Sequence, residues 1–573
     1  MRRGCLIAVL LCTAQAIGLA AGTSARAEDP AASNLSPPSL TPNLQPTPAP
    51  TPQTTQNSAP AEALSPPPEP AQPLPEPSGA SDQPPLAAAP PAANADPVVQ
   101  IVRSKLADPA IREGANPDDL AALEAFYAAR AGGPLWMTDM GFSARAQSAL
   151  FEIAKADDWG LSAASFELPK ADALPASAEA QAAAELKLDL AILKYARYAR
   201  GGRFDPLALS KLLDQAPPVR NPRLVLTELE AASSPGVYLQ SLHPKHEQFV
   251  RLRQALLKAR TGIGDDAKPA SDRDIKKIVI NMERWRWMPE DLGKLYVWNN
   301  SPEYMLYVVK DGKPIFADRT LVGTLAYATP VFTNDMKTIV FNPDWNAPQT
   351  VVTENLLPPL RDGNLSILKV HKLSVSLNGT PVDPARVDWN RVNILNYTFS
   401  QKAGPENVLG KIKFLYPNRH TVYMHDTLAY RKKFFQRPER AIGHECVRME
   451  KPLAFAEALL AADKGWSADQ VKELWDNAVN KSVSIEHQIP VYMVYFTAVI
   501  DDAGKVSSFA DLYGLDNKMA SAMFGSAAGF PTPPPESRLS EEEAEAQGSA
   551  PSRPSQSAPS HNDIAGSLGF ISD

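Results

Sequence analysis

The sequence predicts an α+β protein in which a mostly helical domain, residues 98–270, precedes a β-rich domain, residues 271–528. Apolar residues of the first domain recur at helical spacing among good helix formers. From Ile278 onward, short runs of aromatic and β-branched residues alternate with turn residues, as in strands. Over 400 residues lie between the two low-complexity ends of the chain, which is enough for two hydrophobic cores.

Residues 1–27 have the layout of a secretory signal peptide. Two arginines open it, an apolar run from Leu6 to Ala21 follows, and Ala25-Arg26-Ala27 has the small-x-small pattern of a cleavage site. No later stretch of about twenty apolar residues occurs in the sequence. We therefore expect export and no transmembrane segment after cleavage; a signal retained as an anchor is the alternative.

The composition of residues 28–97 predicts a disordered linker, and that of residues 529–573 predicts a disordered acidic tail. The chain has 55 prolines, of which 21 lie in residues 30–97 among small and polar residues. Such segments cannot bury enough apolar surface to fold. The formal net charge is −7 and there is no long basic run, so the sequence predicts no nucleic-acid partner.

In the first domain, apolar spacing predicts a series of helices. The pattern is clearest over residues 185–200, where Gly201-Gly202 is expected to end the helix. The other predicted helices cover residues 120–127, 144–151 and 242–257. No group of residues with an evident chemical role lies in this domain, and its tryptophans are interpreted as core residues.

The second domain is predicted to alternate strands, turns and irregular loops. We place the boundary near residues 265–275, where Gly262, Gly264 and Pro269 occur. The predicted strands cover residues 304–309, 338–341, 374–377, 411–416, 421–425 and 491–497. Turns are predicted at residues 311–312, 417–420 and 501–505, and helices from Pro452 and over residues 467–478.

Cys446 is the only cysteine outside the predicted signal peptide, which holds Cys5 and Cys12. A lone thiol in an exported protein is a buried apolar residue, an intermolecular linker, a metal ligand or a nucleophile. His425 lies 21 residues earlier, at the end of a predicted strand, and the intervening loop can return the chain beside it. Because a thiol attacks as thiolate, a neighbouring imidazole that accepts its proton favours the nucleophile.

Residues next to Cys446 can take part in the same chemistry. On an extended segment His444 and Cys446 share one face. Backbone N–H groups of Glu445 and Cys446 can form an oxyanion hole, and Arg448 can bind a carboxylate or hold the loop. The three residues His425, His444 and Cys446 also suit a zinc site with an open position, so the metal alternative stays open. The other histidines, including His420 in the predicted turn, are given no role in a site.

These segments resemble the L,D-transpeptidases of bacterial cell walls, which have a YkuD-type catalytic domain, and in particular their large periplasmic members with a helical scaffold domain. A histidine followed about twenty residues later by Cys-Val-Arg matches His425 and Cys446-Val447-Arg448. The likeness is strongest over residues 278–515. Further matching segments are residues 281–289, 329–332, 342–346 and 404–414, and Tyr423-Met424-His425-Asp426-Thr427.

The resemblance implies a cysteine acyltransferase in the periplasm. Cys446 would attack the carbonyl between diaminopimelate and D-alanine in a peptidoglycan tetrapeptide stem, with His425 as base. An amine of a second stem would resolve the thioester and leave a diaminopimelate–diaminopimelate crosslink. Tyr423, His444, Glu445 and Arg448 are the candidate supporting or substrate-binding residues. No metal or organic cofactor is implied, and other cell-wall synthesis proteins are candidate partners.

One residue departs from the family pattern, because Glu445 stands where glycine usually precedes the cysteine. Glycine adopts backbone angles that other residues resist, so Glu445 is expected either to strain the loop or to give it another form. Its negative charge is expected to raise the pKa of the Cys446 thiol. Two alternatives to crosslinking therefore remain: a hydrolase or D-amino-acid exchanger on the same fold, and a non-catalytic peptidoglycan-binding scaffold.

Overall fold

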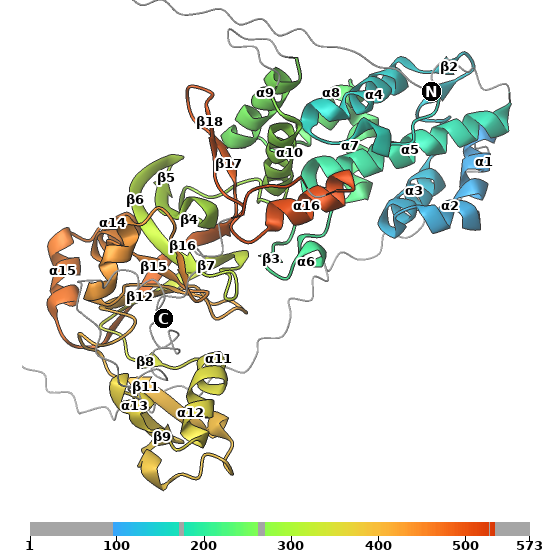
Figure 1. The fold of residues 1–573 in the computed structure, drawn as a ribbon. Coiled ribbons are helices and arrows are strands. Elements are labelled where there is room, and N and C mark those ends of the chain that lie inside the picture. Colours follow the sequence, from blue (N-terminus) through green and yellow to red (C-terminus); the bar gives the residue numbers. More distant parts are fainter. Residues whose placement is uncertain (1–95, 171–176, 262–269, 527, 533–573) are drawn as a thin grey trace, which may run out of the picture. The chain divides into compact units, whose positions relative to one another are not determined.

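The computed structural model describes residues 96–170, 177–261, 270–526 and 528–532. The predicted signal peptide, residues 1–27, lies outside the described residues. So do nearly all of the predicted linker, residues 28–97, and nearly all of the predicted tail, residues 529–573. The described chain is helical up to about residue 286 and rich in strands from residue 295 onward, which confirms the predicted α+β class (Figure 1).

The helical part has one long central helix with shorter helices packed around it. Helix α5 (Ala178–Gly201) buries Leu186, Ile192 and Tyr195 in a core shared with its neighbours. The glycine at position 202 ends this helix at φ +82°, as the sequence predicted. The other helices are α1 (Pro97–Leu106), α2 (Pro109–Gly114), α3 (Pro117–Ala129), α4 (Ala144–Ala154), α6 (Pro206–Leu209), α7 (Pro222–Ala231), α8 (Pro235–Ser241), α9 (Glu247–Thr261) and α10 (Asp272–Arg286).

The sequence specifies many of these helix starts locally. A side chain such as Asp96, Asn116 or Asn221 accepts a backbone N–H of the first turn, and proline follows it at the first helical position. Proline is tolerated there because that residue has no intrahelical N–H bond to lose.

The predicted helix over residues 242–257 is partly wrong. Helix α8 ends at Ser241 and α9 begins only at Glu247. Pro244 lies between them, and a proline both lacks the N–H that a helix needs and biases the preceding residue away from helical angles. Apolar spacing continued across this break, so the pattern alone did not reveal it.

The β-rich part is built on a sheet that closes on itself. Its strands follow the order β12, β13, β15, β6, β5, β4, β16, β7 and β3; β12 also pairs with β7, and β14 pairs with β6. The strands are β3 (Leu213–Asp214), β4 (Leu295–Asn300), β5 (Met305–Lys310), β6 (Lys313–Gly323), β7 (Val331–Phe341), β12 (Ile412–Leu415), β13 (Met424–His425), β14 (Ala441–Gly443), β15 (Val447–Met449) and β16 (Lys481–Val494).

Strands β5, β7, β12 and β16 confirm four of the predicted strands, but the strand predicted over residues 421–425 is shorter than expected. Only Met424 and His425 pair in the sheet, as β13. Thr421 has φ +59°, which is a left-handed conformation that breaks an extended strand. The chain therefore enters the sheet only after this residue.

Helices return after β15, as predicted. Helix α14 (Pro452–Lys464) packs Phe455, Leu459 and Leu460 against the interior of the sheet. Helix α15 (Ala468–Asp476) begins with a capping box between Ser467 and Gln470. The hairpin of β17 (Ala498–Ile500) and β18 (Val506–Ser508) confirms the predicted turn between them, and helix α16 (Leu515–Phe524) follows.

A separate small unit, which we call the insert, lies between β7 and β12 and has a core of its own. The sequence predicted only the strand over residues 374–377 within it. It combines β8 (Trp345–Asn346), α11 (Gln349–Val351), the π-helical turn η4 (Val352–Leu356), α12 (Leu357–Arg361), α13 (Ser366–Val370), β9 (Ser374–Leu377), β10 (Thr380–Pro381) and β11 (Tyr397–Gln401). Its four strands form a sheet in the order β10, β9, β11 and β8.

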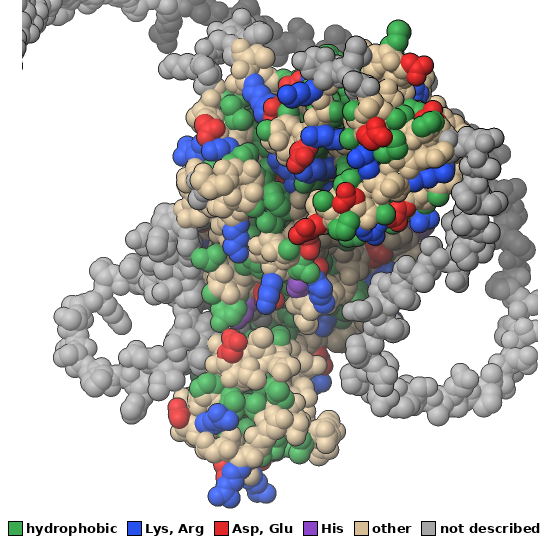
Figure 2. All heavy atoms as spheres, turned by 90° about the vertical axis from the view of Figure 1, so that its right-hand side faces the viewer, with side chains coloured by type: hydrophobic (Ala, Val, Ile, Leu, Met, Phe, Trp, Pro, Cys, Tyr) green, Lys and Arg blue, Asp and Glu red, His purple; other side chains and the backbone are tan. Residues whose placement is uncertain are grey.

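Helix α10 connects the helical part to the closed sheet. Its Met282 and Trp285 share a core with Leu252 of α9 and with Tyr492 and Val494 of β16. Within the residues that the structure describes, no helix is long and apolar enough to cross a membrane. The face drawn in Figure 2 mixes acidic and basic side chains over its upper part rather than separating them by sign.

Candidate active site

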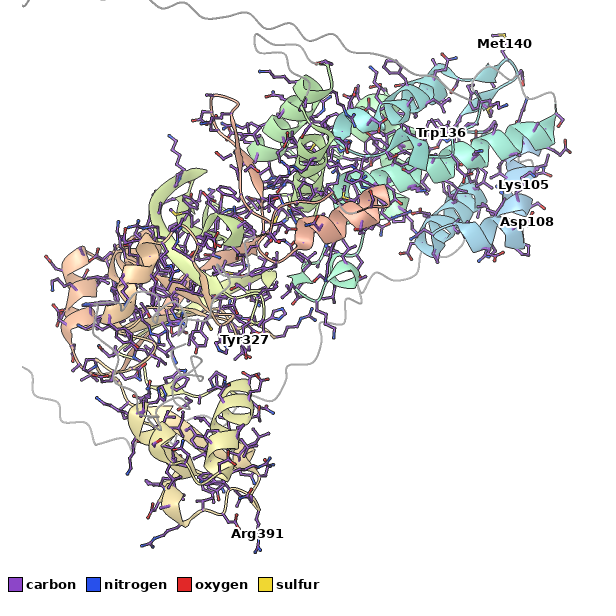
Figure 3. All side chains as sticks on the ribbon, viewed as in Figure 1. Lys105, Asp108, Trp136, Met140, Tyr327 and Arg391 are labelled. Carbon is purple, nitrogen blue, oxygen red and sulfur yellow. The ribbon has the colours of Figure 1, made fainter. Side chains whose placement is uncertain are left out.

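Cys446 lies between β14 and β15, on the wall of a cavity of about 540 Å³. The residue as a whole is partly buried. The cavity is lined by side chains from four places: around the cysteine, in the turn before β13, in the insert, and at Tyr327 in the segment after β6. These residues are Tyr327, Trp345, Pro348, Gln349, Thr350, Val351, Thr353, His420, Thr421, Tyr423, His444, Glu445 and Cys446. Tyr327, labelled in Figure 3, therefore lies where the sheet meets the insert.

The loop that carries Cys446 is held on both sides by the segment after β6. The backbone N–H of Thr324 donates to the Gly443 carbonyl at 2.7 Å. The Thr329 hydroxyl donates to the Glu445 carbonyl at 2.8 Å and accepts the N–H of Gly323 at 2.9 Å. The backbone at Gly323 passes close to the backbone of Tyr327 and His444, and we call this place the backbone crossing. A Cβ atom at position 323 would lie 1.8 Å from the Tyr327 carbonyl oxygen, so only glycine fits there.

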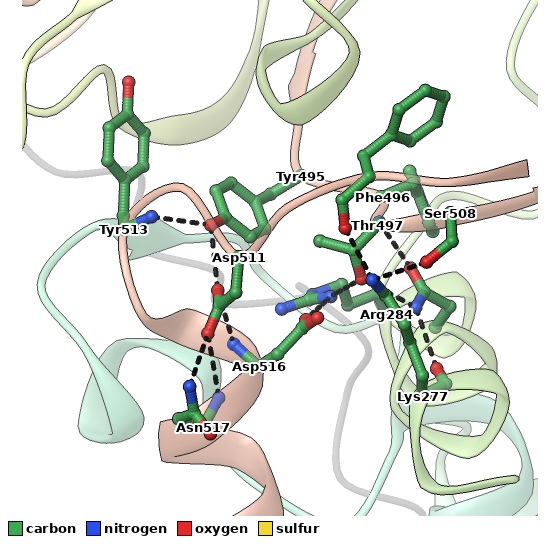
Figure 4. A network of polar contacts seen from close by, with 12 residues as sticks. Lys277, Arg284, Tyr495, Phe496, Thr497, Ser508, Asp511, Tyr513, Asp516 and Asn517 are labelled. Carbon is green, nitrogen blue, oxygen red and sulfur yellow. Dashed lines mark hydrogen bonds and ion pairs between the residues drawn. The ribbon is translucent and has the colours of Figure 1, made fainter. Parts of the chain in front are cut away.

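A buried network of hydroxyls and carboxylates supports this segment from the C-terminal side (Figure 4). The Tyr513 hydroxyl donates to the Gly323 carbonyl at 2.9 Å and accepts the Thr329 N–H at 3.3 Å. Its backbone N–H donates to the Tyr495 hydroxyl at 2.7 Å, and Tyr495 donates to Asp511 at 2.9 Å. The network continues to α10, where Arg284 pairs with Asp516 at 2.6 Å (Figure 4).

Tyr423 is the side chain in contact with the thiol. Strands β13 and β15 run in parallel with Met424 opposite Val447, and the Val447 N–H donates to the Tyr423 carbonyl at 3.2 Å. The Tyr423 hydroxyl is within hydrogen-bond reach of Cys446. Because side chains alternate along a strand, Tyr423, His425, Cys446 and Arg448 share one face of this pair.

Burial raises the pKa of the Cys446 thiol to about 11. The backbone of Tyr423 and the positive charge of Arg448 oppose this rise, whereas the negative charge of Glu445 adds to it. A thiol with such a pKa is protonated at neutral pH. A nucleophilic role for Cys446 would therefore require a base.

His425 is fully buried at the end of β13 and does not line the cavity. Burial lowers the pKa of its imidazole well below the ordinary value, and the charge of Arg448 lowers it further. Apart from the backbone of Asp426, neither ring nitrogen has a hydrogen-bond partner within the described residues. The ring is thus neutral, in the form that accepts a proton, on the strand beside Cys446.

His444 stacks on Tyr327 with ring centroids 3.9 Å apart, and it lines the cavity together with Cys446 as the alternation along the chain predicted. Burial lowers the pKa of His444 to about 4, with Arg448 contributing. This side chain is therefore a neutral aromatic part of the wall.

Glu445 is exposed and lines the cavity beside Cys446. It is not among the residues with positive φ in the described chain, so it causes no left-handed strain. The loop thus has an ordinary backbone form at this position. Partial burial raises the pKa of Glu445, and the charge of His420 opposes the rise.

Arg448 is almost fully buried and does not line the cavity. Burial lowers the pKa of its guanidinium to about 9, and the nearby Arg431 adds to the effect. It lies close enough to Cys446 and Tyr423 to act on their charges. Of its two predicted roles, this position favours holding the loop over binding a substrate carboxylate.

Sequence reasoning missed several residues of the cavity. His420 was assigned to a turn and Thr421 to a strand, yet both line the wall. The insert contributes Trp345 and the start of α11, and no local pattern marked these residues. Among the described residues, no three His, Cys, Asp or Glu side chains gather as metal ligands, so the zinc alternative has no ligand set there.

Comparisons with known proteins agree with this arrangement. Residues 294–485 match the family of L,D-transpeptidase catalytic domains (YkuD), and residues 121–256 match the scaffold domain family. A curated protein of Haemophilus influenzae, named as a presumed L,D-transpeptidase, is 33% identical over 246 residues, 43% of this chain and 49% of that protein. The match thus spans about half the length of that relative. The chain therefore contains a region that matches the scaffold domain family, followed by one that matches the YkuD-type L,D-transpeptidase catalytic domain, and the latter is the family that the residues around Cys446 predicted.

Proposed function

We propose that the protein is a cell-wall L,D-transpeptidase that forms 3-3 crosslinks between diaminopimelate residues of peptidoglycan. The observation that supports this best is the position of Cys446, on the wall of a cavity within the matched catalytic domain, with a neutral imidazole on the neighbouring strand.

In the first half-reaction the Cys446 sulfur attacks the carbonyl carbon between diaminopimelate and D-alanine of a tetrapeptide stem. His425 accepts the thiol proton and passes it to the nitrogen of the leaving D-alanine, which yields a thioester. Because the thiol pKa is raised to about 11 and the imidazole is neutral, the resting pair is uncharged. The proton therefore moves only as the sulfur–carbon bond forms.

In the second half-reaction an amine of another stem attacks the thioester and the sulfur leaves. The amine loses a proton to His425, which returns it to the sulfur. Tyr423 and Arg448 stabilise negative charge on the sulfur, since both lower the pKa of Cys446. His444 and Glu445 form part of the wall that the stems contact.

The predicted signal peptide and the substrate place the protein in the periplasm, with peptidoglycan stems as donor and acceptor. Export is tested by comparing the mass of the secreted chain with that expected after cleavage at residue 27. Other cell-wall synthesis proteins remain candidate partners, and pull-down from crosslinked cells with the intact chain tests this.

The function is tested with purified tetrapeptide muropeptides. The unmodified chain is expected to release D-alanine and form crosslinked dimers, and Cys446→Ala is expected to abolish both. Intact-mass analysis should show a thioester adduct of a carbapenem on the unmodified chain and none on the variant. A Cys446→Ala variant that keeps its activity, or an unmodified chain that binds peptidoglycan without acylation, would refute the proposal.

A second function, hydrolysis of the thioester or exchange with a free D-amino acid, is favoured by Glu445. A partly desolvated carboxylate beside the acyl group can orient water or a small ammonium ion. Mass spectrometry of the products separates the three outcomes: crosslinked dimers, tripeptides, or tetrapeptides with a new terminal residue.

A further inference from the structure

A strand from the scaffold part enters the sheet of the catalytic domain. Strand β3 lies inside the stretch that matches the scaffold family, residues 121–256, and pairs in parallel with the start of β7. Leu213 lies opposite Val331 and Asp214 opposite Phe332. The Val331 N–H also donates to the Leu212 carbonyl at 2.7 Å. The position of Asp214 is therefore fixed by the catalytic sheet itself.

Asp214 binds the turn that precedes β13. Its Oδ2 atom lies 2.7 Å from Nε2 of His420 and accepts a hydrogen bond from Nε of Arg419 at 2.6 Å; Arg419 makes a second contact with Oδ1. The side chains of Asp214 and His420 are 24% and 19% exposed, whereas that of Arg419 is 59% exposed. Water therefore weakens the contact between Asp214 and Arg419 more than the contact between Asp214 and His420.

His420 has a fixed place in the cavity wall. It lines the cavity together with Glu445 and Cys446. The Asn418 side chain donates to the carbonyls of Tyr416 and Val422, both at 2.7 Å, and thereby fixes the turn backbone. The ring packs near Phe332, at 5.3 Å between centroids, and its hydrogen bond is to Asp214. The carboxylate of Asp214 therefore decides how the imidazole is oriented.

We propose that Asp214 is a positioning residue of the active site, through which the scaffold domain orients His420 for contact with the bound stem peptide. Because Nε2 faces a carboxylate at 2.7 Å, Nε2 carries a proton and donates it to Asp214, which leaves the Nδ1 side of the ring for a ligand. The inference rests on the proposed function, since it takes the cavity as the place where the stem binds. It gives the scaffold domain a role in substrate binding.

The test is a double-mutant cycle on D-alanine release by the full chain, with Asp214→Asn, His420→Gln and the double variant. Loss of one charge-assisted hydrogen bond is expected to raise KM by about tenfold and to change kcat by less than about twofold. The double variant should be no worse than either single variant, because both remove one interaction. A normal KM in Asp214→Asn, or additive effects in the double variant, would overturn the inference.

Arg419→Gln is the matched control, because it removes the other partner of Asp214 and leaves the pair with His420. Its KM is expected to stay within about twofold of the unmodified chain. A tenfold rise would mean that Asp214 acts through Arg419 and would also overturn the inference. Thermal unfolding of each variant shows whether a change in KM accompanies a loss of folding.

A second readout does not depend on turnover. In ¹⁵N-histidine spectra of the full chain, the His420 ring is expected to show the Nε2–H form, and Asp214→Asn is expected to shift it toward a mixture of tautomers. Identical His420 signals in both proteins would overturn the inference. If the unmodified chain released no D-alanine while the spectra changed as expected, the proposed function would fail and the positioning of His420 would stand.

Discussion

At the scale of single residues, the charge state of Cys446 decides how the protein reacts with electrophiles. With a pKa of about 11, only about one thiol in ten thousand is ionised at pH 7. We expect alkylation by iodoacetamide to be slow at pH 7 and to accelerate about tenfold per pH unit up to about pH 10. Intact-mass measurements from pH 6 to 10 give these rates. A rate that levels off below pH 9 would indicate a stable thiolate and contradict this expectation.

The charge of Glu445 also affects the pKa of the Cys446 thiol, and a substitution can measure this effect separately. Its negative charge raises the pKa of Cys446, so Glu445→Gln is expected to lower that pKa and to shift the alkylation profile toward lower pH. Glu486→Gln, which changes an exposed carboxylate paired with Lys464, is the control and should leave the profile unchanged. Coincident profiles for all three proteins would mean that water screens the charge of Glu445 from the sulfur.

At the scale of elements, the loop with Cys446 depends on one close backbone crossing. A Cβ at position 323 would meet the Tyr327 carbonyl at 1.8 Å and the His444 carbonyl at 2.9 Å. We therefore expect Gly323→Ala to move the cysteine loop, to lower stability by about 1–3 kcal/mol and to reduce D-alanine release by more than the loss of folded protein explains. Gly132→Ala, at a site with no atom within 4 Å, is the control for thermal unfolding and activity.

Tyr513 supports the same crossing through its hydroxyl. Tyr513→Phe removes its bonds to Gly323 and Thr329 and is expected to cost about 1 kcal/mol of stability and to lower kcat. Tyr492→Phe removes a comparable bond, to the Leu292 carbonyl at 3.0 Å, far from the cysteine loop. The two variants should lose similar stability in denaturant unfolding, and only Tyr513→Phe should lose activity. Equal activities would show that the hydroxyl does not position the loop.

The same elements show what the sequence could and could not predict. Local signals sufficed for β5, α14 and α15, since strand composition, a first-turn proline and a capping box act within a few residues. They failed where the apolar pattern ran on through Pro244, and where Thr421 adopts positive φ. Cys446 and its neighbours could be named as candidates because a lone reactive residue is visible in sequence, whereas Asp214 and the insert come near the cavity only through long-range pairing.

At the scale of the whole molecule, the predicted boundary near residue 270 cuts through a shared core. Helix α9 and strand β3 both precede it, yet Leu252 packs with Tyr492 and Val494 of the sheet, and Asp214 pairs beside β7. Glu283 of α10 also forms a buried pair with Arg203 of the scaffold part. The boundary was predicted from the glycines and the proline between residues 262 and 269, and these contacts indicate that the two domains fold as dependent parts.

A chain truncated to residues 271–528 is accordingly expected to be much less stable than the full chain. It would remove Phe249, Leu252 and Leu256 of α9 from the core that they share with α10 and the sheet, and would leave Glu283 without its partner Arg203. Each large apolar side chain returned to water costs about 1.5–3 kcal/mol, and total stabilities of domains are about 5–15 kcal/mol. We expect aggregation or a large drop in the unfolding temperature, measured by calorimetry. A truncated chain that unfolds cooperatively at the temperature of the full protein would show instead that the catalytic domain folds alone. The scaffold domain would then contribute only to the cavity wall, through Asp214, and not to stability.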